Sequence, residues 1–366
     1  MVMPLWEPLV VVLVAALATY GLDRWLLDWF LKQKIQSSIR KDGPATHQSK
    51  AKTPALGGAA FPLGFFLALL VIAPWLGKDG DLDLHDPRQL VTIALLAFIV
   101  AMSFLLGFAD DYLKVIRKSS EGLKARYRFP VQLLLGLLLG YAVSKTVGAS
   151  YMQFLPIPHH EPMGLKASWL LVLWTMLFFS ATLNGVNFTD GLDTLLAGTA
   201  LPALVVLAGL SYGWFGEAVQ PNILLGHAAL AGAGTLLGFY PLNRHPAKLF
   251  MGDGGAYFLA ALMATIAVLQ GSVFLFFLIG LVFFLELVSV MIQVTVFRLT
   301  GGRRRVFPMA PLHHSFEVKG WPEERVVSLF WGIALLSAIL SIALARSLQS
   351  PAAPTRSTQV HAGTHH

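Results

Sequence analysis

Ten apolar stretches, separated by short polar loops, run along almost the whole chain. Their approximate limits are 8–30, 57–76, 89–109, 129–147, 168–187, 194–213, 223–241, 254–270, 273–298 and 326–346. A helix needs roughly 20 apolar residues to cross the hydrocarbon core of a bilayer, which is close to the length of these stretches. Their apolar residues are continuous, as in VQLLLGLLLGY at 131–141, and do not alternate as in a membrane β-strand. The pattern predicts an all-α, polytopic integral membrane protein with about ten transmembrane helices.

Composition supports this fold class. The chain has 366 residues, of which 55% are hydrophobic and only 13% are charged, whereas about 25% of a soluble protein is charged. We expect one transmembrane catalytic domain over residues 1–349 and a polar, Pro- and Thr-rich disordered tail over 350–366. Glu7, with no basic region before it, indicates a retained first helix rather than a cleaved signal. Because the chain has no cysteine, disulfides and thiolate metal sites are excluded.

Positive charge is concentrated in alternate loops. The loops after the first, third, seventh and ninth stretches, with the helix ends beside them, hold 20 of the 27 lysines and arginines. The loop at 77–89, on the opposite side, is acidic on balance. By the positive-inside rule the odd-numbered loops are cytoplasmic and both termini are periplasmic. Membrane topology together with attraction to anionic lipid is the favoured explanation of this charge, and the same charge would raise the local concentration of a phosphate substrate.

Four polar clusters follow the third, fifth, seventh and ninth stretches. They contain Asp110 and Asp111, then Asn187, Asp190 and Asp193, then Asn243, Phe250 and Asp253, and finally His313 and His314. Loops of the same parity face the same side of a membrane, so these clusters can converge although they are far apart in sequence. The layout favours a membrane enzyme with a single assembled polar site.

Carboxylates dominate the first three clusters. Asp110 and Asp111 end a helix, where negative charge opposes the helix dipole, so stability does not account for them. Adjacent carboxylates suit a shared divalent cation, or one base beside one metal ligand; a solvated interfacial pair is the alternative. Asp253 stands between glycines that would let a phosphate approach the backbone, although Gly-Asp-Gly also forms plain turns.

The remaining polar positions each admit two interpretations. Segment 184–195 either binds a ligand near a helix start or only links two helices. His313 and His314 either donate to a diphosphate or belong to a solvated loop, and zinc is not expected there. Phe250 is either a core residue or a platform on which a base stacks. Glu286, within the ninth stretch, belongs to a proton relay or pairs with a polar neighbour.

The clusters together predict phosphoryl transfer to or from a lipid phosphate. They offer oxygen ligands for Mg²⁺, glycines that would let phosphates approach the backbone, and a position on the cytoplasmic side that is open to lipid. A transporter or flippase is the alternative from another class. It would carry substrate across sealed vesicles without releasing a nucleotide. The scarcity of polar residues within the apolar stretches argues against a translocation path.

Five motifs, in this order and in these loops, carry a resemblance to a known family. They are KAKTPALGG (50–58), GFADDYLKV (107–115), NFTDGLD (187–193), NRHPAKLFMGD (243–253) and MAPLHHSFEVKGWPE (309–323). With them the chain, up to its tail, resembles the phospho-N-acetylmuramoyl-pentapeptide transferases. The aspartate motifs are shared with the wider polyprenyl-phosphate sugar-1-phosphate transferases, and the histidine segment is typical of this family. The resemblance implies a ten-helix enzyme of the bacterial inner membrane, typically a homodimer, with its site facing the cytoplasm.

The resemblance implies transfer of phospho-MurNAc-pentapeptide from UDP-MurNAc-pentapeptide to undecaprenyl phosphate, giving lipid I and UMP with Mg²⁺ as cofactor. It also implies contact with membrane lipid and binding of nucleoside-type inhibitors; nucleic acid is not an expected partner. By motif it assigns catalysis to Asp110 as the base, to Asp111 and Asp253 as metal ligands, and to His313. The substrate-binding residues that it implies are Lys50, Asn187, Asp190, Gly191, Leu192, Asp193, Asn243, Phe250 and His314, with the uracil at 191–193 and on Phe250.

Three positions depart from the family's motifs. Ala55 lacks a hydroxyl, Ser315 replaces a third consecutive histidine and Ala256 replaces a serine, which puts a functional role at each in question. Two routes stay open for the chemistry. Either the acceptor phosphate attacks the β-phosphorus directly after Asp110 removes its proton, or an aspartate first forms a covalent phospho-sugar intermediate. The alternative function is that of a sister transferase that uses UDP-GlcNAc or a related UDP-sugar.

Overall fold

The structure, a computed structural model, describes residues 4, 6–33, 53–78, 82–117, 122–146, 168–215 and 222–348. These residues form helices joined by turns, in agreement with the predicted all-α class. The long helices are α1 (Trp6–Lys32), α2 (Phe61–Lys78), α3 (Pro87–Val115), α4 (Ala125–Thr146), α5 (Ser168–Thr189), α6 (Leu195–Ser211), α7 (Ile223–Asn243), α8 (Gly252–Leu269), α10 (Leu281–Leu299) and α12 (Glu323–Ser347). The short ones are the 3₁₀-helix η2 (Gly57–Ala60), α9 (Val273–Ile279) and α11 (Leu312–Val318). Lys50 and the predicted tail at 350–366 lie outside the described residues.

Within the described part of the chain, nine helices are long and apolar enough to cross a membrane, and α6, with 17 residues, is a shorter apolar one. The predicted polytopic membrane fold is therefore confirmed. One predicted extent is wrong, because the stretch 273–298 is divided at Gly280 into α9 and α10. Glycine is a poor helix former, and Gly280, with a φ of −96° and a ψ of 25°, departs from helical geometry between α9 and α10.

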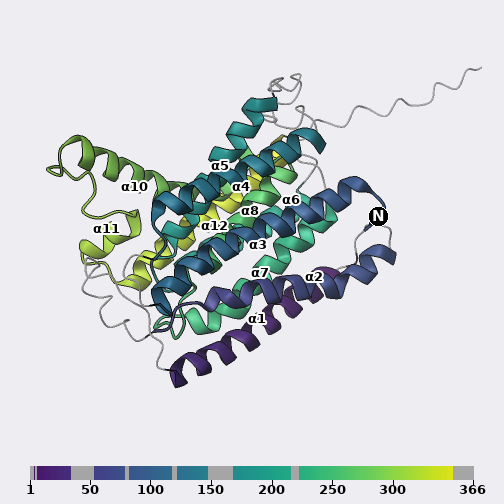
Figure 1. The fold of residues 1–366 in the computed structure, drawn as a ribbon, viewed down its shortest axis with the longest axis horizontal. Helices are drawn as coiled ribbons and strands as arrows, with labels where there is room; N and C mark the ends of the chain where they lie inside the picture. The colour runs from purple at the N-terminus through teal and green to yellow at the C-terminus, as the bar shows by residue number, and fades with distance from the viewer. Residues whose placement is uncertain are drawn as a thin grey trace, which may run out of the picture.

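Helix α8 lies inside the bundle and packs against both α3 and α5 (Figure 1). Its residues are buried without a break from Gly254 to Val268. Small residues allow membrane helices to approach closely, and a Cβ at Gly107 of α3 would lie 2.3 Å from the carbonyl oxygen of Asp253. The first turn of α8 is therefore held against the end of α3, where Asp110 and Asp111 lie.

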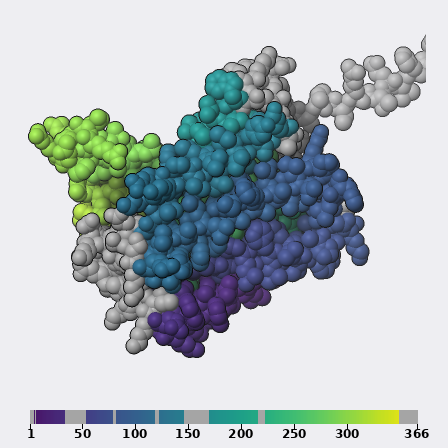
Figure 2. All heavy atoms as spheres, in the orientation of Figure 1, coloured from purple at the N-terminus to yellow at the C-terminus, as the bar shows by residue number. Residues whose placement is uncertain are grey.

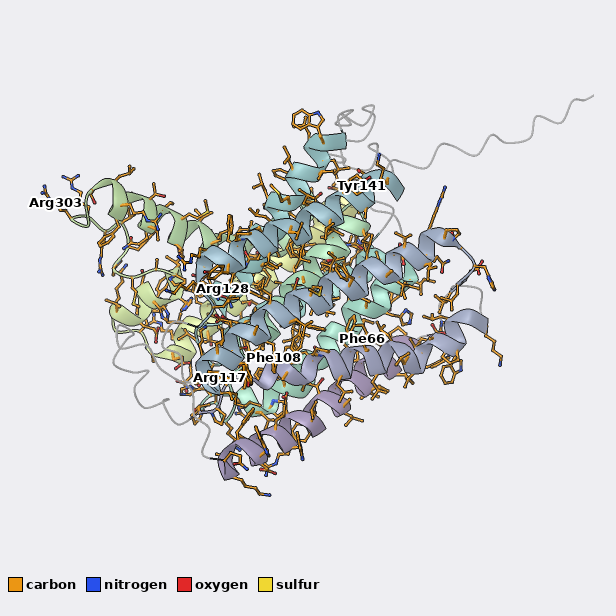
Figure 3. All side chains as sticks on the ribbon, in the orientation of Figure 1. Phe66, Phe108, Arg117, Arg128, Tyr141 and Arg303 are labelled. Carbon is orange, nitrogen blue, oxygen red and sulfur yellow. The ribbon has the colours of Figure 1, made fainter. Side chains whose placement is uncertain are left out.

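The polar helix ends gather at one end of the bundle. Arg117, just after α3, and Arg128, near the start of α4, lie at that end, whereas Tyr141 of α4 lies towards the other (Figure 3). Since α8 begins where α3 ends, Asp253 is brought to the same end as Asp110 and Asp111.

Helix α10 leaves the bundle and, with α11, forms a lobe that projects to one side (Figure 1). Two polar side chains of α10 hold the next segment against it: Gln293 accepts the N–H groups of Val306 and Phe307 at 3.0 Å, and Glu286 accepts those of α11. Figure 2 shows a hollow between this lobe and α4 and α5. A groove of about 570 Å³, lined mainly by apolar side chains of α4, α5 and α10, lies between these helices.

Candidate active site

The two adjacent aspartates at the end of α3 are both buried, and Asp111 caps another helix. Asp111 is 5% exposed, and its carboxylate oxygens accept hydrogen bonds from the N–H groups of Asp253 at 3.0 Å and Gly254 at 2.8 Å. The first N–H groups of a helix have no partner within it, so Asp111 satisfies two donors of α8. Gly252 has a φ of 81°, and a Cβ there would stand 2.6 Å from Oδ2 of Asp111. Glycine is therefore needed at this turn.

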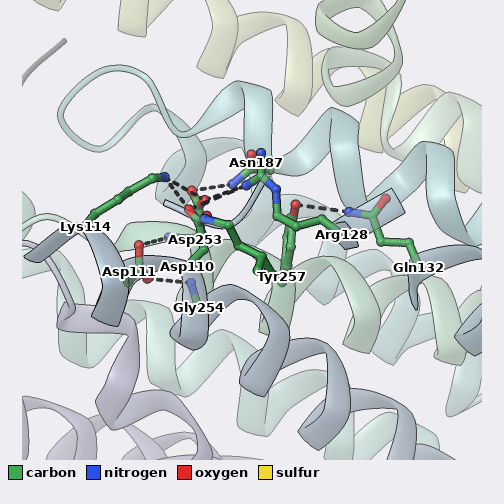
Figure 4. Close-up of polar contacts among 10 residues, drawn as sticks. Asp110, Asp111, Lys114, Arg128, Gln132, Asn187, Asp253, Gly254 and Tyr257 are labelled. Atoms are coloured by element: carbon green, nitrogen blue, oxygen red, sulfur yellow. Dashed lines mark hydrogen bonds and ion pairs between the residues drawn. The ribbon is translucent and has the colours of Figure 1, made fainter. Parts of the chain in front are cut away.

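Asp253 joins four helices at one carboxylate (Figure 4). Its Oδ2 accepts from Lys114 Nζ at 3.1 Å and from Arg128 Nη1 at 3.0 Å, and its Oδ1 accepts from Asn187 Nδ2 at 2.9 Å. Lys114 also pairs with Asp110, four residues earlier on α3, and Arg128 Nη1 lies 3.5 Å from Oδ2 of Asp110. The side chains of Lys114 and Arg128 thus face the carboxylates of Asp110 and Asp253. Their opposite charges offset the free-energy cost of burying these carboxylates in a low dielectric.

Asp190 begins the turn between α5 and α6, beside the same acids. Burial, followed by the nearby charges of Asp253 and Asp193, raises the pKa of Asp190 to about 7, and a hydrogen bond from the backbone of Gly252 opposes the rise. Near neutral pH this carboxyl is therefore present in both its charged and its neutral form.

Three carboxylates in this cluster have the chemistry of a divalent cation site. Asp110, Asp111 and Asp253 each offer one oxygen, and these oxygens lie within 4.8 Å of one another. Mg²⁺ takes oxygen ligands and is usually held by one or two carboxylates together with substrate phosphates. The residues present fit that requirement.

His313 approaches this end of the bundle from α11. Its side chain is fully buried, and Nδ1 lies 3.2 Å from Oε1 of Glu286. Glu286 also accepts the N–H groups of Leu312 at 2.5 Å and His313 at 3.3 Å. These contacts agree with the interpretation that Glu286 pairs with a polar neighbour. The other ring nitrogen, Nε2, has no hydrogen-bond partner among the described residues and faces Gly191, where a Cβ would lie 2.2 Å away.

Two more of the predicted residues lie on this side of the molecule. His314 pairs through Nδ1 with Oε2 of Glu317 at 2.6 Å. Leu192 is buried in an apolar cluster with Val326 and Phe330, so its side chain belongs to the packing.

Asn243 and Phe250 lie on either side of the segment between α7 and α8. The amide of Asn243 accepts from the N–H of Thr194 at 2.9 Å and donates to the carbonyl of Leu249 at 3.0 Å, so it ties this segment to the 190–194 turn. Phe250 is half-buried, whereas Leu249 and Met251 on either side are buried. Phe250 is therefore not fully buried, and its role as a stacking platform stays a prediction.

The three departures from the family's motifs have structural surroundings. Ser315 closes its own turn, because its hydroxyl bonds the carbonyl of Met309. Ala256 is fully buried in α8, and Ala55 packs, half-buried, against the main core. None of these contacts involves the acids of α3 and α8.

Sequence reasoning did not assign Lys114, Arg128 or Tyr257 to the site. The sequence does not distinguish Lys114 and Arg128 from the other basic residues that set topology, although Lys114 follows Asp110 by the one helical turn that lets two side chains meet. Tyr257 lies one turn beyond Asp253, and its hydroxyl accepts from Gln132 at 3.0 Å. That hydrogen bond links α8 to α4 next to Asp253, and nothing in the sequence predicts it.

Comparison with known proteins shows the family of this chain. The sequence profile of the family described as Glycosyl transferase family 4 matches residues 93–271, which include the acids of α3 and α8. A protein of Symbiobacterium thermophilum is 40% identical over 309 residues, covering 83% of this chain and 85% of its own. One of Heliobacterium modesticaldum is 36% identical over 341 residues (92% and 97%), and one of Lactiplantibacillus plantarum is 38% identical over 326 residues (87% and 92%). All three are named phospho-N-acetylmuramoyl-pentapeptide-transferase.

The fold and these relatives therefore define a polytopic membrane transferase. Identity over most of the chain is specific enough to go one step further. The chain belongs to the phospho-N-acetylmuramoyl-pentapeptide transferase family, as its motifs indicate.

Proposed function

We propose that this protein transfers phospho-MurNAc-pentapeptide from UDP-MurNAc-pentapeptide to undecaprenyl phosphate and so forms lipid I and UMP. The observation that carries the proposal is the cluster of Asp110, Asp111 and Asp253, whose carboxylates lie within 4.8 Å of one another with Lys114 and Arg128 beside them. Phosphoryl transfer needs little more than positioning and neutralisation of charge, and this cluster supplies both.

An apolar groove beside the acids suits the polyprenyl chain of the acceptor. Asn184 of α5 lines the groove between α4, α5 and α10. Asn187, three residues later and on the same face of the helix, donates to Asp253. A lipid lying in the groove would therefore bring its phosphate towards the acids while its hydrocarbon stays in contact with apolar side chains.

The reaction joins an oxygen of the acceptor phosphate to the β-phosphorus of the UDP-sugar and breaks the bond from that phosphorus to the oxygen that leaves with UMP. Substrate and product are both pyrophosphate diesters, so the exchange is close to thermoneutral. We assign Asp110 to accept the proton of the acceptor phosphate, and Lys114 and Arg128 to offset the charge of the diphosphate. A Mg²⁺ held by Asp253 and Asp111 would polarise the phosphoryl oxygens. An aspartyl phospho-sugar trapped without acceptor would favour the covalent route over direct attack.

Phe250, at the edge of the core, is the residue that we assign to stacking on the uracil. Replacement by alanine should raise KM for the UDP-sugar about tenfold, since stacking of a base on an aromatic ring contributes about 1–3 kcal/mol. KM for undecaprenyl phosphate should change less than twofold. Phe66, half-buried on α2, gives the matched control: Phe66→Ala should leave KM for the UDP-sugar unchanged. Equal increases in both KM values for Phe250→Ala would contradict the assignment.

The sugar donor separates this function from its runner-up. Purified protein with undecaprenyl phosphate and Mg²⁺ is given either UDP-MurNAc-pentapeptide or UDP-GlcNAc, and the lipid-extractable product is measured. We expect lipid-linked product from the first donor only. Product from UDP-GlcNAc alone would identify a sister transferase instead.

We propose further that the protein lies in the bacterial inner membrane as a homodimer, with both termini periplasmic, its site facing the cytoplasm and nucleoside-type inhibitors as competitors of the donor. The excess of basic residues in the odd-numbered loops supports this orientation. Arg117 and Arg128 at the site's end of the bundle agree with it.

A further inference from the structure

A second polar cluster lies beside the acids and is centred on His245. Its Nδ1 lies 2.9 Å from Oδ2 of Asp193 and 3.7 Å from Oε2 of Glu323, and its Nε2 lies 3.7 Å from Oε1 of Glu324. Three carboxylates therefore face one imidazole. The ring is 35% exposed, whereas the Asp193 carboxylate is 1% exposed, so the histidine covers a buried acid from the solvent side.

The members of this cluster come from three separate elements. Asp193 belongs to the 190–194 turn between α5 and α6, His245 to the segment between α7 and α8, and Glu323 is the first residue of α12. Further bonds tie the same pieces together: Asp193 Oδ2 also accepts the N–H of Ala247 at 3.0 Å, and the N–H of Asp193 donates to Oε1 of Glu323 at 2.8 Å. His245 and Asp193 thus connect the 190–194 turn, the segment between α7 and α8, and the start of α12.

The 190–194 turn and the segment between α7 and α8 contain the residues that we propose to bind the nucleotide. The turn contains Gly191, and the segment after His245 ends at Phe250. The segment is also fixed on its far side, because the backbone of Phe250 bonds that of Pro54 and Gly57 at 2.9 Å. The distance between the turn and the Phe250 ring therefore depends on the contact between His245 and Asp193, together with the hydrogen bonds of Asn243 to Thr194 and Leu249.

We propose that His245 is a positioning residue for the nucleotide half of the donor. By donating from Nδ1 to Asp193, it holds the Phe250 segment in register with the 190–194 turn, so that the base meets both at once. This inference rests on the proposed function. It adds a residue that is separate from the cluster of Asp110, Asp111 and Asp253 and that acts through Asp193.

The test replaces His245 and follows the two substrates separately in the full-length protein. His245→Ala should raise KM for UDP-MurNAc-pentapeptide and the inhibition constant of UMP by the same factor, about five- to tenfold, the scale of the net contribution of one hydrogen bond. We expect kcat and KM for undecaprenyl phosphate to stay within twofold. His245→Asn, whose side-chain amide can donate from the position of Nδ1, should recover most of the loss.

Controls separate this inference from general damage and from the proposed function. His85→Ala, in an exposed loop far from the site along the chain, should leave every constant unchanged. If His245→Ala lowers kcat and raises both KM values together, or if His245→Asn is no better than alanine, His245 has only a general structural role and the inference is wrong. Absence of UMP release by the wild-type protein would instead reject the proposed function itself.

Discussion

Asp253→Asn should reduce kcat by about three orders of magnitude, the scale seen when a transition-state charge stabiliser is removed. The change keeps the shape of the side chain but removes the charge that Lys114 and Arg128 contact at 3.1 and 3.0 Å. It also removes one of the three carboxylates that fit a divalent cation. The measurement is single-turnover formation of lipid I at saturating donor and acceptor.

The matched control for Asp253→Asn is Asp28→Asn on α1. Asp28 forms an exposed i,i+4 pair with Arg24 at 3.5 Å, and such surface pairs contribute little to stability. Its removal should leave kcat unchanged. If Asp253→Asn keeps more than a tenth of the wild-type kcat, neither the charge nor the metal-ligand role of Asp253 is required, and the acid cluster is not the catalytic centre.

Gly191→Ala should reduce kcat about 100-fold, because small displacements of reacting groups have effects of this size. The added Cβ would lie 2.2 Å from Nε2 of His313, which is too close for the two to keep their positions. His313 cannot easily turn away, since Glu286 holds both its ring and its backbone. Either the imidazole or the turn that carries Asp190 and Asp193 must shift.

Gly21→Ala provides the control for this change. A Cβ at Gly21 of α1 would meet no atom within 4 Å, and alanine in a helix is favoured over glycine by about 1 kcal/mol. Activity should be unchanged and stability equal or higher. Wild-type kcat in Gly191→Ala would mean that His313 does not need its present position, and its catalytic assignment would have to be withdrawn.

The convergence of Asp110, Asp111 and Asp253 could be predicted because it follows from membrane topology and from the chemistry of carboxylates. Asp110 and Asp253 are 143 positions apart, yet helix parity puts both on one side of the membrane, and a shared divalent cation gives them a reason to meet. Lys114 and Arg128 were missed for a related reason. Basic residues beside membrane helices already have an explanation in topology, so nothing in the sequence set these two apart from the other lysines and arginines.

Features that depend on tertiary contacts were not accessible from the pattern. The division of the ninth stretch at Gly280 is hidden because apolar residues continue on both sides of it. The partner of Glu286 could not be named, since α11 folds back onto α10 only in three dimensions. His245 looks like an ordinary loop residue until Asp193 and Glu323 are seen to face it.

The most direct test of the central claim is the release of UMP by the purified protein from UDP-MurNAc-pentapeptide. With Mg²⁺ and undecaprenyl phosphate, we expect many turnovers, with one lipid I formed for each UMP released. Without undecaprenyl phosphate, release should not exceed one equivalent per protein chain. Continuous UMP release without the acceptor, or no UMP release when both substrates are present, would contradict the account.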